Sequence, residues 1–139
     1  MKRLLEKLCR DRGITALYAF GSRAGEAAAL VRGQREALAE TDADLDLGIL
    51  LRRGSWLDVR DKVRLAAALE DLFAAPRVDL VLLAGAPAFL AVEIVSAELL
   101  VDLDPDATAE FELYVLRRAG DLIGFERQRI QDVIRGGAR

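Results

Sequence analysis

Segments of two different periodicities alternate along the chain, and this alternation constrains the fold more than any other feature. Short runs of apolar and β-branched residues predict four strands, at residues 14–20, 44–51, 77–83 and 99–103. The stretches around them have helical spacing or composition and predict five helices, at residues 1–12, 23–40, 55–73, 86–98 and 105–136. A regular alternation of helices and strands predicts an α/β or α+β fold.

Residues that favour helix ends stand at most of the predicted boundaries. Gly13 suits the end of the first helix, and a break is expected near Gly33. Ser55 followed by Asp58 has the form of a capping box and predicts a helix that opens at Ser55. The remaining signals are Pro87 in a first turn, Asp104 and Pro105 as cap and first residue, Gly120 and Gly124 as weak points or close-packing sites, and a frayed tail at residues 135–139.

The length and composition fit one globular domain that spans residues 1–139. The chain is 53% hydrophobic and 31% charged, and it is long enough to bury one core but too short for two. No apolar run could cross a bilayer, and the charged N-terminal segment MKRLLEKLCRDRG has no evident signal peptide, so we expect a cytoplasmic protein. The single cysteine, Cys9, follows an apolar helical stripe with Leu5 and Leu8, which predicts core packing and not a reactive thiol.

The charge balance and the absence of histidine exclude several classes of function. Twenty basic and 23 acidic side chains give a net charge of −3, which argues against a broad nucleic-acid surface. Without histidine, Ser-His-Asp hydrolysis, histidine-ligated zinc and histidine-based ribonuclease chemistry are excluded within this chain. Any catalysis must therefore use carboxylates, hydroxyls, amines or a metal held by oxygen.

Two aspartates open the second predicted strand, in the stretch TDADLDLGIL. Successive side chains of a strand point to opposite faces, so Asp44 and Asp46 should project together while the leucines between and after them are buried. Two carboxylates that close repel each other unless a cation lies between them, and oxygen ligands suit Mg²⁺ or Mn²⁺. A D-x-D pair alone also fits a solvated strand edge whose charges deter aggregation.

A turn and a third aspartate accompany this pair. Gly21, Ser22 and Arg23 stand where the first strand passes into a helix, where backbone N–H groups and the helix dipole attract phosphate. Taken alone, this tripeptide fits a plain turn with a serine cap equally well. Asp79 interrupts the apolar strand RVDLVLL, where an unpaired buried carboxylate would be costly, and the alternative is a salt bridge to Arg77 or another basic residue. The joint arrangement favours a metal–phosphate site over these separate explanations.

These three features resemble the minimal nucleotidyltransferases (MNT) of the DNA polymerase β superfamily over nearly the whole chain. YAFGSRAGEA resembles the family's strand followed by G-S-R, DADLDLGIL its D-x-D strand, and RVDLVLL the strand that supplies the third acid. The resemblance implies a nucleotidyltransferase-like mixed sheet of about four strands flanked by helices, with a long C-terminal helix. It also implies nucleotide binding by Gly21, Ser22 and Arg23, and catalysis and metal binding (Mg²⁺ or Mn²⁺) by Asp44, Asp46 and Asp79.

The resemblance further implies a substrate and a partner. Small stand-alone members of the family are antitoxins of HEPN proteins, helical ribonuclease toxins, and silence them by transferring AMP from ATP to a toxin tyrosine. The expected assembly is therefore a hetero-oligomer with a HEPN toxin. The predicted C-terminal helix, AEFELYVLRRAGDLIGFERQRI, fits either contact with that partner or ordinary cover for the core.

One departure from the family pattern concerns spacing. Between Ser22 and Asp44 lie 21 residues, whereas the family's usual spacing is about half that, and the extra ALVRGQREALAE predicts one or two added helical turns beside the site. Arg32 and Arg35 in this segment could contact ATP phosphates, a partner or only solvent. Two alternatives to the antitoxin stay open: a nucleotidyltransferase of small molecules such as antibiotics, and an antitoxin that acts by binding alone.

Overall fold

The computed structural model describes residues 1–137 and contains alternating helices and strands, as the sequence predicts. The helices are α1 (Lys2–Asp11), α2 (Ala24–Val31), α3 (Val59–Phe73), α4 (Ala88–Val95) and α5 (Pro105–Gly137). The strands are β1 (Ile14–Phe20), β2 (Leu45–Leu51), β3 (Val78–Leu82) and β4 (Glu98–Asp102). Each strand lies within one residue of its predicted bounds, so Asp44 falls just outside β2.

The four strands form one mixed sheet in the order β3-β2-β1-β4. The buried strand β1 runs antiparallel to β2 and β4, whereas β2 and β3 are parallel and are connected through α3. This topology brings the end of β1 and the starts of β2 and β3 to the same edge of the sheet. The predicted α+β fold with a mixed four-stranded sheet is confirmed.

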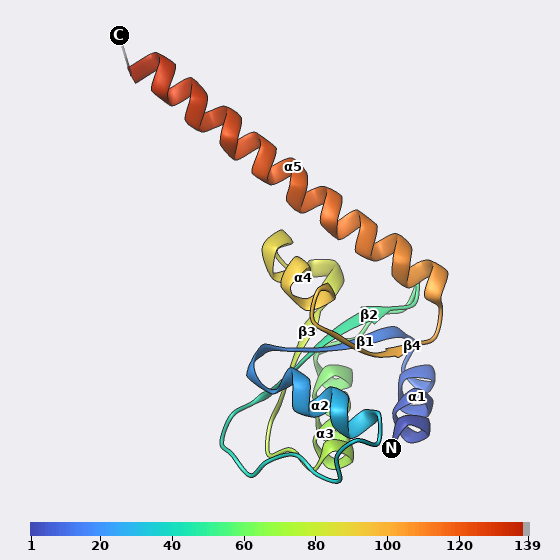
Figure 1. Ribbon diagram of the computed structural model, residues 1–139. Helices are drawn as coiled ribbons and strands as arrows, with labels where there is room; N and C mark the ends of the chain where they lie inside the picture. Colours follow the sequence, from blue (N-terminus) through green and yellow to red (C-terminus); the bar gives the residue numbers. More distant parts are fainter. Residues whose placement is uncertain (138–139) are drawn as a thin grey trace.

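Helices cover both faces of this sheet (Figure 1). The helices α1, α2 and α3 lie on one face, where Leu45, Leu47 and Ile49 of β2 join the larger apolar core. The helices α4 and α5 lie on the other face over a second cluster that includes Tyr18. There α4 packs so closely on β2 that a methyl group at Gly48 would collide with the Ile94 side chain. Asp46, two residues before Gly48, therefore faces the α4 side of the sheet.

The helix predicted over residues 23–40 is much shorter in the structure. It ends at Val31, and Gly33 adopts a left-handed conformation with φ of +74° that stops the helix. Residues 32–44 form neither helix nor strand, so the prediction of added helical turns between Ser22 and Asp44 was wrong. Side chains of α2, and of the turn that precedes α2, hold this connecting segment.

The start of α3 also differs from its prediction. Asp58, not Ser55, is the N-cap: its carboxylate accepts a hydrogen bond from the Asp61 N–H at 2.7 Å. The Asp61 side chain accepts in return from the Asp58 N–H at 3.3 Å, which completes a capping box worth about 1 kcal/mol. The capping box therefore joins Asp58 with Asp61, and not Ser55 with Asp58 as predicted.

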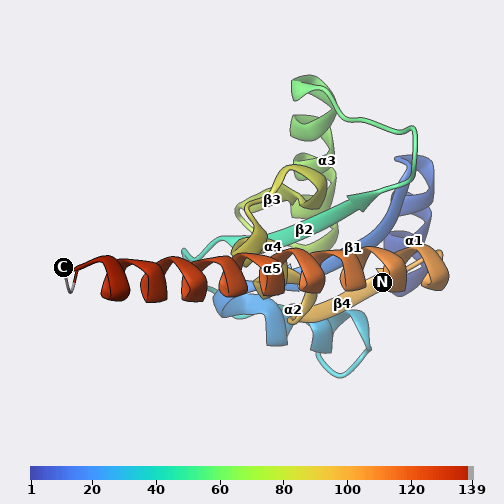
Figure 2. The ribbon, with the colours of Figure 1, turned by 90° about the horizontal axis from the view of Figure 1, so that it is seen from above.

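The long helix α5 begins as predicted and extends well past the rest of the molecule (Figures 1 and 2). The Asp104 carboxylate caps it by accepting from the Ala107 N–H at 3.2 Å. Its first half contacts α4 and β1 and buries Thr108, Val115 and Ala119, whereas every residue from 120 to 136 is exposed. A methyl group at Gly120 or Gly124 would meet no neighbouring atom within 4 Å, so neither is a close-packing site.

Two sequence expectations concern the ends and the environment of the chain. The tail predicted to fray, residues 135–139, extends α5 through Gly137, and its last two residues lie outside the described part. Within residues 1–137, no helix combines the length and the apolarity needed to cross a membrane. Cys9 is buried in the larger core, which confirms its predicted packing role.

Candidate active site

Three neighbouring strands bring the predicted site residues side by side at one end of the sheet. Phe20, the last residue of β1, pairs with Asp46 of β2, and Asp46 pairs with Asp79 of β3. Register partners in neighbouring strands project to the same face, so both carboxylates lie on the α4 side of the sheet. The turn that follows Phe20 is thus directly beside them.

This turn lies against the Asp46 carboxylate. Gly21 opens a single turn of 3-10 helix, Gly21–Arg23, with φ of +72°, a conformation that favours glycine. A methyl group at Gly21 would stand 2.5 Å from Asp46 Oδ2. Gly21 and Ser22 are both exposed, and α2 begins at Ala24 immediately after the turn. The structure therefore brings together Gly21, Ser22, Asp46 and Asp79.

Like charges surround Asp46. Partial burial raises the pKa of its carboxyl above the ordinary value, and the charges of Asp79, Asp44 and Glu93 raise this pKa further, in that order. Glu93 is an exposed residue of α4 that the sequence reasoning missed, because no local pattern places α4 over the start of β2. The close contact between Gly48 and Ile94 positions α4, and with it Glu93, near the other acids.

Asp44 and Asp79 differ from their predicted environments. Asp79 is exposed, so the premise that it is a buried carboxylate was wrong. The alternative pairing of Asp79 with Arg77 is not the one that forms, since Arg77 Nε lies 3.7 Å from Asp44 Oδ2. Arg77 is 77% exposed, which makes this a weak and exchangeable ion pair.

The donors at this edge fit a hard divalent cation. All are carboxylate oxygens, the ligands that Mg²⁺ and Mn²⁺ prefer. Burial and then the neighbouring acids raise the pKa of Asp46, and a bound cation would relieve the repulsion between these acids. Within residues 1–137, no three acids are already arranged closely enough to hold a metal ion. The Asp44 carboxylate instead lies beside the Arg77 guanidinium.

The arginines near the site have partners within the protein. The Arg23 side chain is only 2% exposed, and its guanidinium donates to the Ala39 and Ala43 carbonyls, so it does not face the turn's exposed surface. Arg32 pairs with Glu98 at 3.1 Å, and Arg35 lies 3.6 Å from Glu26. Any role of Arg23 toward a nucleotide is therefore limited to its backbone.

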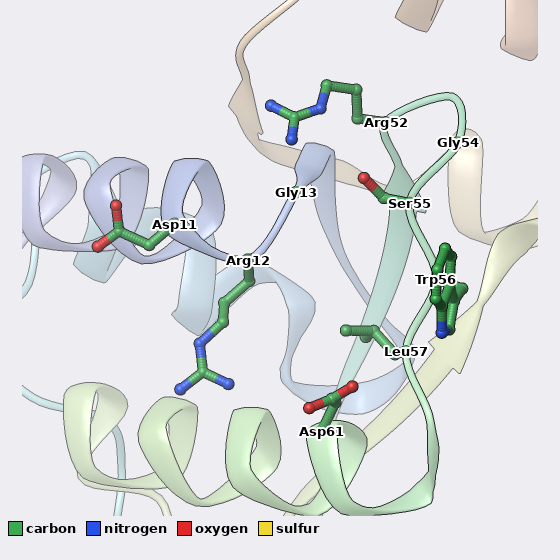
Figure 3. Close-up of a pocket in the computed structure, with 9 residues that line it drawn as sticks. All are labelled: Asp11, Arg12, Gly13, Arg52, Gly54, Ser55, Trp56, Leu57 and Asp61. Carbon is green, nitrogen blue, oxygen red and sulfur yellow. The ribbon is translucent and has the colours of Figure 1, made fainter.

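A separate hollow of about 460 Å³ lies at the opposite end of the sheet (Figure 3). Its walls come from Gly13 directly before β1, from the loop that contains Arg52 and Trp56, and from Asp61 of α3. The seven-residue strand β1 separates it from Gly21 by roughly 20 Å, given the rise of about 3.3 Å per strand residue. None of the predicted site residues lines it.

Comparison with known proteins gives a family and several similar folds. The model of the family described as polymerase beta, nucleotidyltransferase matches residues 2–106. A search of the curated proteins returned no match. The matched residues include the turn, all four strands and the three predicted acids.

Similar solved structures cover almost the whole chain, including much of α5. A chain of a toxin–antitoxin complex with AMP-PNP matches with a TM-score of 0.64 and 23% identity, over 96% of this chain and 98% of that one. A chain of the MntA–HepT toxin–antitoxin complex gives a TM-score of 0.63 and 21% identity, over 96% of each chain. A chain of the tri-AMPylated Shewanella oneidensis HEPN toxin in complex with MNT antitoxin gives 0.61 and 23%, over 96% and 99%. At these identities the likeness establishes a shared fold.

Proposed function

The chain belongs to the polymerase beta nucleotidyltransferase family, and from that premise we propose that it transfers AMP from ATP to a hydroxyl group of a HEPN toxin. In this proposal the acceptor is a tyrosine, and its modification makes the protein the antitoxin of the pair. Residues 1–139 act as one nucleotidyltransferase domain in the cytoplasm, where ATP is available and Cys9 stays reduced.

The observation that carries the proposal is the row formed by the Gly21–Ser22 turn, Asp46 and Asp79. Backbone groups of an exposed turn can bind the β- and γ-phosphates of ATP, because Gly21 has no side chain to block their approach. Asp44, Asp46 and Asp79 would hold Mg²⁺ or Mn²⁺. Such a cation, when bound, neutralises charge on the transferred phosphoryl group and on the leaving pyrophosphate.

The exposed position of Asp79 suits a role toward the acceptor. A hydroxyl oxygen of the toxin forms a bond to the α-phosphorus of ATP, the bond from that phosphorus to the bridging oxygen breaks, and pyrophosphate leaves. The hydroxyl proton passes to Asp79, which faces solvent and can release it there. Orientation of the three groups supplies much of the rate in this type of transfer.

Two observations support a protein acceptor. The solved structures that share this fold include a complex with AMP-PNP and a tri-AMPylated HEPN toxin bound to its MNT antitoxin. In addition, the exposed half of α5 presents apolar side chains that the protein's own sheet leaves uncovered, namely Leu122, Ile123, Phe125, Ile130, Val133 and Ile134. A small acceptor would need an enclosing pocket, whereas a folded toxin brings its own surface.

Co-expression with a candidate HEPN toxin, followed by incubation with Mg·ATP and intact-mass analysis, tests the proposal. We expect the toxin to gain the mass of one or more AMP units with the wild type and none with Asp46→Asn. A panel of aminoglycosides provides the second arm. Adenylylated antibiotic with an unmodified toxin would establish the small-molecule alternative, and inhibition of the toxin without any mass change would establish neutralisation by binding alone.

A further inference from the structure

The buried side chain of Arg23 connects the phosphate turn to the segment that leads into β2. Arg23 follows Ser22 directly, yet its guanidinium points into the protein and is 2% exposed. Nη2 donates to the Ala39 carbonyl at 2.7 Å, and Nη1 donates to the Ala43 carbonyl at 3.2 Å. Both carbonyls belong to residues 32–44, which form neither helix nor strand.

Glu26, in the first turn of α2, holds the same segment from a second direction. Its Oε1 accepts a hydrogen bond from the Ala39 N–H at 2.8 Å, and its Oε2 lies 3.4 Å from Arg23 Nε. Ala39 is thus bound through its N–H by Glu26 and through its carbonyl by Arg23. The Ala39 N–H and then the Arg23 and Arg35 charges lower the pKa of Glu26, so it stays ionised at neutral pH.

These contacts matter because of the length of the connection. An irregular segment of this length has many conformations, and its last residue, Asp44, lies outside the strand pairing that fixes β2. The bond to the Ala43 carbonyl acts at the residue directly before Asp44. Since charge-assisted hydrogen bonds are stronger than neutral ones, the guanidinium fixes this point of the chain firmly.

We propose that Arg23 and Glu26 are positioning residues that hold Ala39 and Ala43, so that the backbone at Asp44 stays next to Asp46 and the Gly21–Ser22 turn. This inference rests on the proposed function, because it takes these two aspartates as metal ligands for Mg·ATP. The fork of Arg23 reaches two carbonyls at once, which the single ammonium of a lysine does not reproduce. Arg23 and Glu26 lie within one helical turn of the Gly21–Ser22 turn. One short stretch of the sequence therefore carries both the turn and the side chains that hold the segment before β2.

Two variants and one matched control test the inference. Arg23→Lys keeps the positive charge but loses the two guanidinium nitrogens that donate to both carbonyls. Glu26→Ala removes the carboxylate from a partly exposed helix position, and it keeps the test valid if Arg23→Lys fails to fold. Arg118→Lys is the control, because Arg118 also donates to a backbone carbonyl, that of Ala86, but on the opposite face of the sheet.

Two measurements are made on each purified full-length protein. Glu-C digestion followed by mass spectrometry gives the rate of cleavage after Glu36 and Glu40, inside the held segment. Calorimetry gives the affinity for ATP with Mg²⁺ and with EDTA. We expect both test variants to be cleaved faster and to bind Mg·ATP about tenfold more weakly, as is usual when the partners of metal ligands are lost, with affinity in EDTA unchanged. The control should match the wild type in both.

The outcomes separate this inference from its premise. Faster cleavage of the segment with wild-type affinity for Mg·ATP would overturn the positioning role, since the segment would then be free without effect on the carboxylates. Unchanged cleavage in both variants would also overturn it. A wild type that binds ATP equally well with Mg²⁺ and with EDTA would overturn the proposed metal site itself.

Discussion

Gly21 lies directly against the carboxylate of Asp46, with no room between them for a side chain. A methyl group added at Gly21 would stand 2.5 Å from Asp46 Oδ2, and the φ of +72° at Gly21 is itself unfavourable for other residues. The turn after β1 and the acidic start of β2 are therefore in direct contact, and each depends on the conformation of the other.

This contact predicts that Gly21→Ala impairs nucleotide binding more than Ser22→Ala does. The added methyl group displaces the Asp46 carboxylate and strains the turn, whereas Ser22→Ala leaves the backbone groups of the turn unchanged. Calorimetric titration with Mg·ATP measures the difference. Gly25→Ala is the control, since a methyl group there meets no atom within 4 Å. Equal affinity of Gly21→Ala and wild type would show that the turn is not the phosphate site.

Asp46→Asn should abolish AMP transfer without destabilising the metal-free protein. The variant loses a metal ligand, but it also removes a charge that lies among Asp79, Asp44 and Glu93. Urea denaturation in EDTA should give a free energy of unfolding at neutral pH at least equal to that of the wild type. Transfer at the wild-type rate in ordinary Mg²⁺ would remove Asp46 from the metal site.

The pH dependence of stability provides an independent check on this crowding of charge. Because the folded protein raises the pKa of Asp46, the folded state binds this proton more tightly than the unfolded state does. The metal-free wild type should therefore lose stability as pH rises from the ordinary pKa of an aspartate to the raised one, and Asp46→Asn should lack that loss. Denaturant midpoints in EDTA across the acidic range measure it; identical slopes for the two proteins would contradict the raised pKa.

The parts of this site that the sequence predicts are those set by local signals. The period of two along β2 predicts Asp46 opposite its buried leucines, with Asp44 directly before the strand, and the glycine after β1 predicts the turn. The topology then brings the two together, which the sequence alone indicates only through the family resemblance. The strand positions are equally local, and they agree with the structure to within one residue.

The parts that were missed depend on contacts between distant segments. Nothing in the local sequence distinguishes an arginine that binds nucleotide from one that, like Arg23, binds carbonyls sixteen and twenty residues away. The same holds for Arg77, whose partner is Asp44 and not its near neighbour Asp79. Glu93 reaches the site only because α4 packs over β2.

The buried position of Cys9 predicts a thiol that does not react in the folded protein. Burial, with a smaller contribution from the charge of Glu6, raises the pKa of this thiol to about 12, so almost no thiolate exists at neutral pH. Labelling with a thiol reagent at pH 8 should therefore be slow in buffer and rapid in denaturant. Rapid labelling of the native protein would mean that α1 detaches readily from the core.

The hydrogen bond from Tyr18 to Glu112 predicts a measurable contribution to stability that disappears in strong alkali. Tyr18, in the centre of β1, is fully buried, and its hydroxyl donates at 2.5 Å to Glu112 of α5. Burial and then the Glu112 carboxylate raise the pKa of this phenol, so the folded state keeps its proton where the unfolded state begins to lose it. Tyr18→Phe should cost about 1.5–3 kcal/mol, the usual range for a hydrogen bond to a charged group.

Urea denaturation of Tyr18→Phe beside Tyr114→Phe tests this contribution, because Tyr114 lies on the same helix but is 56% exposed. The stabilisation should be fully present below the unfolded pKa of tyrosine, about 10, and should decline above it. The stability difference between wild type and Tyr18→Phe should therefore narrow in alkali, while Tyr114→Phe should resemble the wild type throughout. An equal loss in the two variants would mean that the bond to Glu112 does not fasten α5 to the sheet.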